Sequence, residues 1–250
     1  HKPLTHPYVF IDGCVQIWPD TDYATLNDHA VTASCITTFR PDDGPGNALE
    51  AVADWYRIAD TYEGVRLAFM AADIVAAKDQ GQAAIVLSSQ GGDFLGQNIH
   101  RLKVFHRLGL RMMIPAYNAR SPLGDGCLEA ANSGLSTLGR AWVEECNRLG
   151  VLIDLTHTGE RTTLEILERT EKPAVFSHSN PKALVDTPRA ITDEQIARCA
   201  ATGGLIGVTN WGPLNFSAEM TARPTLENFL DALDYTIDKA GIDHIGIGTD

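Results

Sequence analysis

The feature that most restricts the fold of this 250-residue chain is a regular alternation of short apolar runs with amphipathic stretches. Short runs bounded by turn residues are typical of strands, and apolar residues at helical spacing are typical of helices that pack on them. Several runs, such as AIVL, VLIDL and LIGV, are apolar throughout, as in parallel sheets covered on both faces. The pattern predicts eight strands: Tyr8–Asp12, Val31–Thr38, Ala83–Ser88, Arg111–Tyr117, Val151–His157, Ala174–Ser179, Leu205–Asn210 and His244–Asp250.

Amphipathic helical patterns separate most of these strands. Glycine often stands where a helix would end before the next strand, because it adopts the left-handed backbone of a helix C-terminus. These glycines are Gly81, Gly109, Gly150, Gly203 and Gly241. The predicted helices are Leu49–Tyr62, Gly96–Leu108, Leu138–Leu149, Arg161–Arg169, Asp193–Ala201 and Thr225–Ala240.

Repeated strand–helix units in a chain of this length predict an α/β fold, the (β/α)8 TIM barrel. A doubly wound open sheet is the competing architecture, but it would carry a phosphate-binding glycine turn after its first strand. The sequence has neither GxGxxG nor a Walker pattern. No linker divides the chain, so we predict a single barrel domain over residues 1–250. We expect this domain to continue beyond Asp250, because a closing helix would cover the last strand.

Charge and composition exclude several classes of function. The chain has 20 basic and 32 acidic residues and a formal net charge of −12, which disfavours a nucleic-acid groove or a basic membrane patch. No apolar run reaches the roughly 18 residues of a spanning helix, and the N-terminus does not read as a signal peptide. Five scattered cysteines without a CxxC pair indicate reduced thiols. We therefore predict a cytoplasmic protein without a nucleic-acid partner or membrane span.

Polar residues at the predicted strand ends are the candidate site, because barrel active sites form at the C-terminal ends of the strands. His157 and His178 end consecutive strands, and Asp250 ends the last one. Imidazole and carboxylate together suit Zn²⁺ or a similar ion that activates water. The alternatives are that each histidine is a satisfied polar group of the barrel and that Asp250 caps a turn. His244 begins a strand at the opposite end and is interpreted as structural.

A series of motifs gives the chain a family resemblance. They are FIDG, QGG, GLRMMIPAYN, SGLSTLGRAWVEECNRLGVLIDLTH, PAVFSHSNPKAL, TPRAITDEQI and AGIDHIGIGTD. On these residues the sequence resembles the membrane (renal) dipeptidases, peptidase family M19. The resemblance implies a metal-dependent barrel of the amidohydrolase type, commonly a homodimer. Typical members hold two zinc ions and hydrolyse dipeptides, including those with a D-residue at the C-terminal position.

Four site positions retain the family residues. The resemblance places His157 and His178 as ligands of one zinc ion and Asp250 beside the other zinc and the attacking water. It places Arg189 at the position that binds the substrate's C-terminal carboxylate, a task suited to a bidentate guanidinium. The expected partner is therefore a small-molecule substrate that carries a carboxylate.

Other positions depart from the family. Its His-x-Asp ligand pair reads Cys14–Val15–Gln16 here, and its metal-bridging glutamate aligns with Gln90. A neutral amide brings no charge to offset the repulsion of two dications, so we expect one zinc ion or a metal-poor pocket. Gln90 is then a weak oxygen ligand. Cys14 is either a thiolate ligand or a small buried residue at a strand end.

The loop from Tyr117 to Cys127 replaces the family's substrate-facing histidine with Tyr117 and is expected over the pocket mouth. Tyr117 is interpreted as a hydrogen-bond donor or acid, with packing as the alternative, and Asn118 as a substrate contact. The leading hypothesis is a dipeptidase-like metallohydrolase in which Asp250 is the general base. A lyase or another amide hydrolase on the same barrel, and an inactive carboxylate-binding protein, are the alternatives.

Overall fold

A curled parallel sheet forms the centre of the computed structural model, which describes residues 7–17, 21–23, 26, 30–216 and 222–250. Its strands follow the order β1-β2-β4-β5-β6-β7, and β3 pairs with β4. The pair β8-β9 continues the curl, because Phe176, just after β7, forms a parallel bridge with Ile206 of β8. The strands are β1 (Ile11–Val15), β2 (Ala33–Thr37), β3 (Val65–Leu67), β4 (Ala83–Ser89), β5 (Leu110–Met113), β6 (Leu152–Asp154), β7 (Ala174–Val175), β8 (Ile206–Val208) and β9 (Ile245–Ile247).

Hydrogen bonds between the two ends of the chain join the last strand to the first. The Asp250 amide donates to the Cys14 carbonyl at 2.8 Å. The buried Asp12 carboxylate accepts from the Thr249 amide at 3.0 Å and from its hydroxyl at 2.6 Å. These contacts bring the C-terminal ends of β1 and β9 together, which confirms the predicted (β/α)8 fold.

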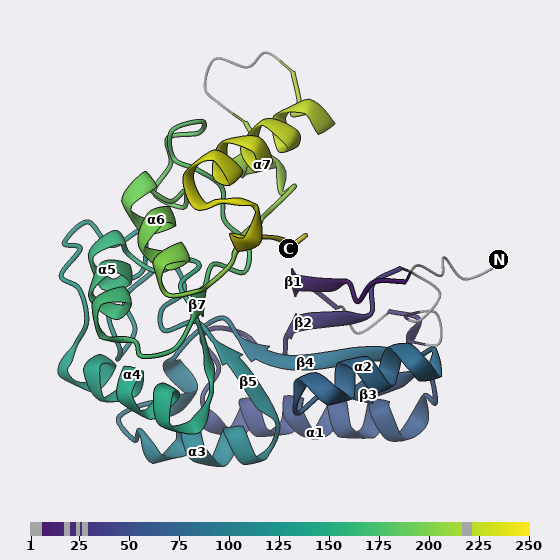
Figure 1. Ribbon diagram of the computed structural model, residues 1–250. Coiled ribbons are helices and arrows are strands. Elements are labelled where there is room, and N and C mark those ends of the chain that lie inside the picture. Colours follow the sequence, from purple (N-terminus) through teal and green to yellow (C-terminus); the bar gives the residue numbers. More distant parts are fainter. Residues whose placement is uncertain (1–6, 18–20, 24–25, 27–29, 217–221) are drawn as a thin grey trace.

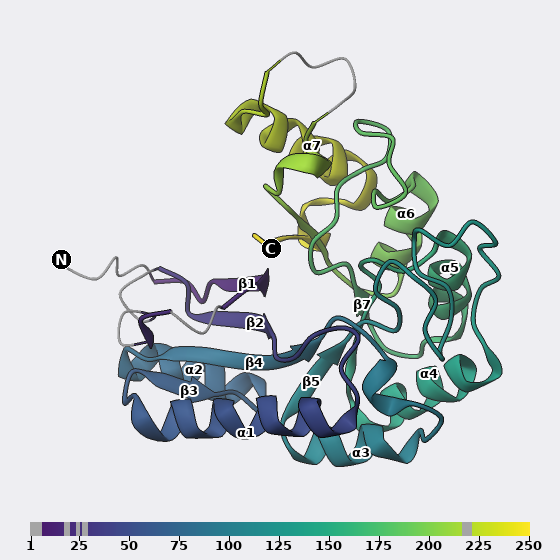
Figure 2. The same cartoon turned by 180° about the vertical axis from the view of Figure 1, so that it is seen from behind.

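The helices lie outside the strands. Figures 1 and 2 show α1, α2 and α3 beside β2, β3, β4 and β5, whereas α4 to α7 follow the later strands. They are α1 (Pro45–Thr61), α2 (Ala71–Gln80), α3 (His100–Arg107), α4 (Thr137–Leu149), α5 (Glu160–Arg169), α6 (Asp193–Ala201) and α7 (Leu226–Ala240), with 3-10 turns η2 (Asp93–Leu95), η3 (Gly212–Leu214) and η4 (Ile242–His244). None of the helices in the described part of the chain combines the length and apolarity that crossing a bilayer requires.

Local signals account for the helix boundaries. The hydroxyl of Ser136 accepts from the Gly139 amide at the start of α4, and Gly150 ends that helix in the left-handed conformation. Thr192 and Gln195 form a reciprocal capping box at the start of α6. These caps set where the chain leaves each helix for the next strand, and so where each strand end lies.

Two elements escape the sequence pattern, and several predicted strands are wrong in their bounds: the last five predicted strands end two to four residues beyond the observed ones, and the first is displaced along the chain. β3 has only three residues, and α2 is rich in alanine and buries only Ala77, so neither leaves a clear period. β1 runs from Ile11 to Val15, three residues later than predicted. The Phe10 amide donates to the Thr32 hydroxyl instead of joining the sheet, and the pairing with β2 shifts between Asp12 and Val15. Cys14 therefore lies within the strand.

Substitutions in the core between the sheet and the helices are expected to lower the free energy of unfolding most. Trp142 of α4 has no exposed surface, and its Nε1 lies 3.1 Å from the sulfur of the equally buried Met113 of β5. Trp142→Ala is expected to lower the free energy of unfolding by about 3–5 kcal/mol, because it leaves a cavity. Val104→Ala, at a 54% exposed position of α3, should change it by less than about 0.5 kcal/mol. Urea unfolding of both variants measures this, and equal losses would contradict the assignment of Trp142 to the core.

Candidate active site

Two buried histidines at neighbouring strand ends form the centre of the site. His157 follows β6 and His178 follows β7, and their Nε2 atoms lie 3.0 Å apart. His157 Nδ1 lies 2.7 Å from Asn118 Oδ1, an atom that can only accept, so Nδ1 is the donor. Burial lowers the pKa of both imidazoles, and the charge of Arg189 lowers them further, so both rings are neutral at pH 7.

A buried carboxylate and hydroxyl orient His178. The hydroxyl of Ser177 donates to Asp154 Oδ2 and lies 2.7 Å from His178 Nδ1. Because the hydroxyl proton is used by Asp154, His178 Nδ1 donates to Ser177 Oγ. Asp154 Oδ1 also accepts from the amides of Thr156 and Ser177, each at 3.0 Å. The sequence analysis missed this series of hydrogen bonds. The aspartate inside the apolar run VLIDL is the signal that could have indicated it.

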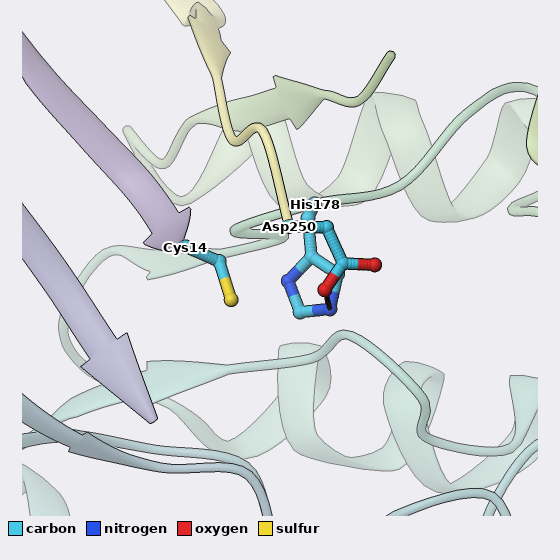
Figure 3. A group of neighbouring side chains, drawn as sticks. All are labelled: Cys14, His178 and Asp250. Carbon is cyan, nitrogen blue, oxygen red and sulfur yellow. Dashed lines mark ion pairs between the residues drawn. The ribbon is translucent and has the colours of Figure 1, made fainter. Parts of the chain in front are cut away.

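Asp250 brings a carboxylate to the same place from the end of β9, which β8 separates from β7. Its Oδ1 lies 3.9 Å from His178 Nε2. Burial raises the pKa of this carboxyl, while the charge of Arg189 and a hydrogen bond with Gln16 lower it. Cys14, His178 and Asp250 form the one group of three potential metal ligands found within the described residues, with ligand atoms all within 4.8 Å of one another (Figure 3).

Backbone strain is concentrated at this site. Asn118, His157 and Asp250 adopt the left-handed conformation with φ of 60°, 63° and 68°, which is uncommon for residues other than glycine. The carbonyl of His157 accepts from the amides of Asn118 and Cys127, so the loop that follows Tyr117 holds it in place. Strain of this kind persists only where the surroundings enforce it, and it marks functional positions.

Arg189 is a partly buried cation without an acidic partner among the described residues. Its Nη2 donates to the His178 carbonyl at 2.9 Å and to His157 Nε2 at 3.2 Å, and its Nη1 donates to Ser179 Oγ at 3.2 Å. Its Nε has no hydrogen-bond partner, and none of the described Asp or Glu side chains lies within 4.0 Å. Burial lowers its pKa, while Cys127 and Asp250 raise it. The guanidinium therefore lacks an anion.

Tyr117 forms part of the wall of a cavity beside Arg189. Its ring packs on that of His157 with centroids 4.0 Å apart. Burial raises the pKa of its hydroxyl, and the charge of Asp250 adds to this effect. The cavity has a volume of about 320 Å³. Its lining combines Tyr117, Asn118, His157, Arg189 and Asp250 with the apolar side chains of Leu128, Pro188, Trp211, Pro213 and Leu214.

The residues at the altered family positions are also neighbours. Gln90 Nε2 lies 3.2 Å from Cys14 Sγ and 2.8 Å from Thr37 Oγ1, and Gln16 Nε2 lies 2.9 Å from the same Thr37 oxygen. The structure thus gathers every predicted site residue around one place. His244 lies elsewhere, with its Nδ1 2.8 Å from the Gly204 carbonyl, in line with a structural role.

The donor set fits a divalent cation. Both imidazoles carry their proton on Nδ1, so two unprotonated Nε2 atoms face each other at 3.0 Å. The Arg189 guanidinium already donates to His157 Nε2, and a cation bound at His178 Nε2 would further offset the repulsion of the two lone pairs. Ligating histidines commonly donate their other ring nitrogen to an oxygen acceptor, as both do here.

The sequence profile of the family described as membrane dipeptidase (peptidase family M19) matches residues 16–250. The chain belongs to this dipeptidase family. Dipeptidase tcpJ of Claviceps purpurea is 30% identical over 203 residues, which cover 78% of this chain and 46% of that protein. The chain thus spans less than half the length of this dipeptidase relative.

Solved structures share the fold of this chain. An amidohydrolase from Pseudomonas aeruginosa matches with a TM-score of 0.89 and 30% identity, covering 97% of this chain and 74% of that one. A metallo peptidase from Rhodobacter sphaeroides, solved with a phosphinate mimic of the dipeptide L-Ala-D-Ala, matches with a TM-score of 0.84 over 97% of this chain and 85% of its own. At 23% identity the second likeness shows the fold alone. The resemblance inferred from the dipeptidase motifs is confirmed.

Proposed function

We propose that this dipeptidase-family chain is a metal-dependent hydrolase that cleaves a dipeptide, or a related amide with a free carboxylate. The observation that carries the proposal is the position of Arg189. Its partly buried guanidinium lines the same cavity as His157 and Asp250, and no described acidic side chain forms an ion pair with it. A substrate carboxylate would supply the missing anion and place the amide beside the two imidazoles.

The proposed metal is zinc, because imidazole nitrogen and carboxylate oxygen are its usual protein ligands. His157, His178 and Asp250 would hold it. A zinc ion held there would polarise a carbonyl and lower the pKa of water.

The side chains of the site take the remaining roles. The Asp250 carboxylate accepts the proton of the attacking water, because burial raises its pKa and so makes it a better proton acceptor, while the charge of Arg189 favours its ionised form. The Tyr117 hydroxyl, at the cavity wall, is placed to donate a hydrogen bond to the substrate, and Asn118 fixes the ring of His157. The apolar wall excludes water from the remaining part of the substrate.

Hydrolysis of L-Ala-D-Ala, measured as released alanine, tests the proposal. Protein loaded with zinc is expected to release alanine, chelator-treated protein should lose at least about 90% of that rate, and zinc should restore it. A zinc-binding protein of unrelated fold, treated in the same way, controls for release by free zinc. An unchanged rate after metal removal, or no release from this dipeptide and a panel of L-L and L-D dipeptides, would contradict the proposal.

The homodimer, the cytoplasmic location and the single-domain organisation stay predictions. The first is checked by the mass of the purified protein in solution, and the second by the distribution of the protein between cell fractions. Limited proteolysis checks the third, because a linker between domains would be cut first.

A further inference from the structure

Cys14 faces the proposed metal from the first strand. Figure 3 shows its side chain beside those of His178, which follows β7, and Asp250, which follows the neighbouring strand β9. Its Sγ, an imidazole nitrogen of His178 and a carboxylate oxygen of Asp250 all lie within 4.8 Å of one another. Ligands of one zinc ion lie about 2.0–2.3 Å from it, so ligand atoms this close can share a single ion.

The backbone fixes this arrangement. The Cys14 amide donates to Asp12 Oδ1 at 3.1 Å, and the Cys14 carbonyl accepts from the Asp250 amide at 2.8 Å. Asp12 also holds Thr249, the residue before Asp250. The thiol and the carboxylate are therefore positioned together by the contacts that close the barrel.

One contact of the sulfur would stabilise a thiolate. Gln90 Nε2 lies 3.2 Å from Cys14 Sγ, and its amide hydrogens can only be donated. An N–H group directed at sulfur stabilises negative charge there. A bound cation deprotonates a coordinating thiol.

Two glutamine amides near Cys14 point their hydrogens at one threonine hydroxyl. Gln16 Nε2 and Gln90 Nε2 both lie within 2.9 Å of Thr37 Oγ1. An amide nitrogen that donates its hydrogens has no lone pair for a metal, and the hydrogens carry partial positive charge. This network opposes a second cation.

We propose that Cys14 is a thiolate ligand of one zinc ion per chain, held together with His178 and Asp250. This inference rests on the metal dependence in the proposed function and changes the nature of the centre. Zinc binding releases the thiol proton to solvent as the S–Zn bond forms. A thiolate in the ligand set favours zinc or cobalt over magnesium and calcium, which prefer oxygen ligands.

Cobalt substitution and X-ray absorption test the ligand directly. Metal-free protein loaded with one equivalent of Co²⁺ is expected to show a near-ultraviolet sulfur-to-cobalt charge-transfer band. The zinc-loaded protein should show one sulfur neighbour at about 2.3 Å and nitrogen or oxygen neighbours at about 2.0 Å. Elemental analysis should give about one zinc per chain, because the amide network opposes a second.

Cys14→Ser is the decisive variant, and Cys35→Ser is its matched control, because Cys35 lies on the adjacent strand β2 and is also largely buried. Cys14→Ser should lose the band and the sulfur neighbour, and its zinc affinity should fall by more than the roughly 10–100-fold that a lost second-shell contact costs. Cys35→Ser should keep both signals.

A zinc neighbour shell of nitrogen and oxygen alone in the unchanged protein would overturn the inference, whether or not Cys14→Ser folds. So would a band that survives in Cys14→Ser, or two zinc ions per chain. Dipeptide hydrolysis without a sulfur neighbour would leave the proposed function standing and remove this inference. A sulfur neighbour without hydrolysis of any amide would support the Cys14 ligand and contradict the proposed function.

Discussion

Replacing His178 with alanine is expected to abolish metal binding and hydrolysis together. The side chain has no exposed surface, and Ser177 holds its Nδ1, so no other group can take the place of Nε2. The loss of zinc affinity should exceed the roughly 10–100-fold cost of removing a second-shell partner. Elemental mass spectrometry of the purified variant and the alanine-release assay measure the two effects.

Ser177→Ala separates orientation from ligation, because it keeps His178 and removes only the hydroxyl between His178 and Asp154. Zinc affinity should fall by about 10–100-fold while the bound metal still supports turnover. Thr163→Val is the matched control, because the Thr163 hydroxyl is buried on α5 without a hydrogen-bond partner. If Ser177→Ala keeps the wild-type zinc affinity, or if Thr163→Val loses as much, the hydrogen bonds from Asp154 through Ser177 do not orient His178.

Replacing Arg189 with methionine is expected to remove the preference for a free carboxylate. Methionine keeps much of the apolar stem but lacks the guanidinium that meets the substrate anion. Losing one partner of a buried charge pair costs about 2–5 kcal/mol, or roughly 30- to 4,000-fold in kcat/KM. The measurement compares L-Ala-D-Ala with its C-terminal amide.

The ratio of kcat/KM for the acid to kcat/KM for the amide decides the interpretation. The unchanged protein should strongly prefer the acid, and Arg189→Met should hydrolyse acid and amide at similar low rates. Arg111→Met is the control, since Arg111 is also partly buried but donates to the backbone carbonyls of Phe69, His106 and Leu110. If Arg189→Met keeps the wild-type ratio and loses only overall rate, Arg189 supports the histidines and does not bind the carboxylate.

Much of the fold was predictable because its signals are local. The helix predicted over Asp193–Ala201 has those bounds in the structure, and Gly150 ends α4 as its position indicated. Capping residues and apolar periods act within a few residues of chain, so one sequence contains them. β3 and α2 were missed because three residues, or an alanine-rich stretch, set no period.

The sequence by itself determined which residues compose the candidate site. His157, His178 and Asp250 stand at strand ends, and parallel strands bring their carboxyl ends to one face of a barrel. Arg189 followed from the family motif. Only the tertiary structure decided what these residues contact: the Asp154–Ser177 support of His178, the amides of Gln16 and Gln90 on Thr37, and the sulfur of Cys14 beside Asp250. Asp12 and Thr249 are 237 positions apart in the chain, and contacts over such separations depend on the closing of the barrel, which no local pattern records.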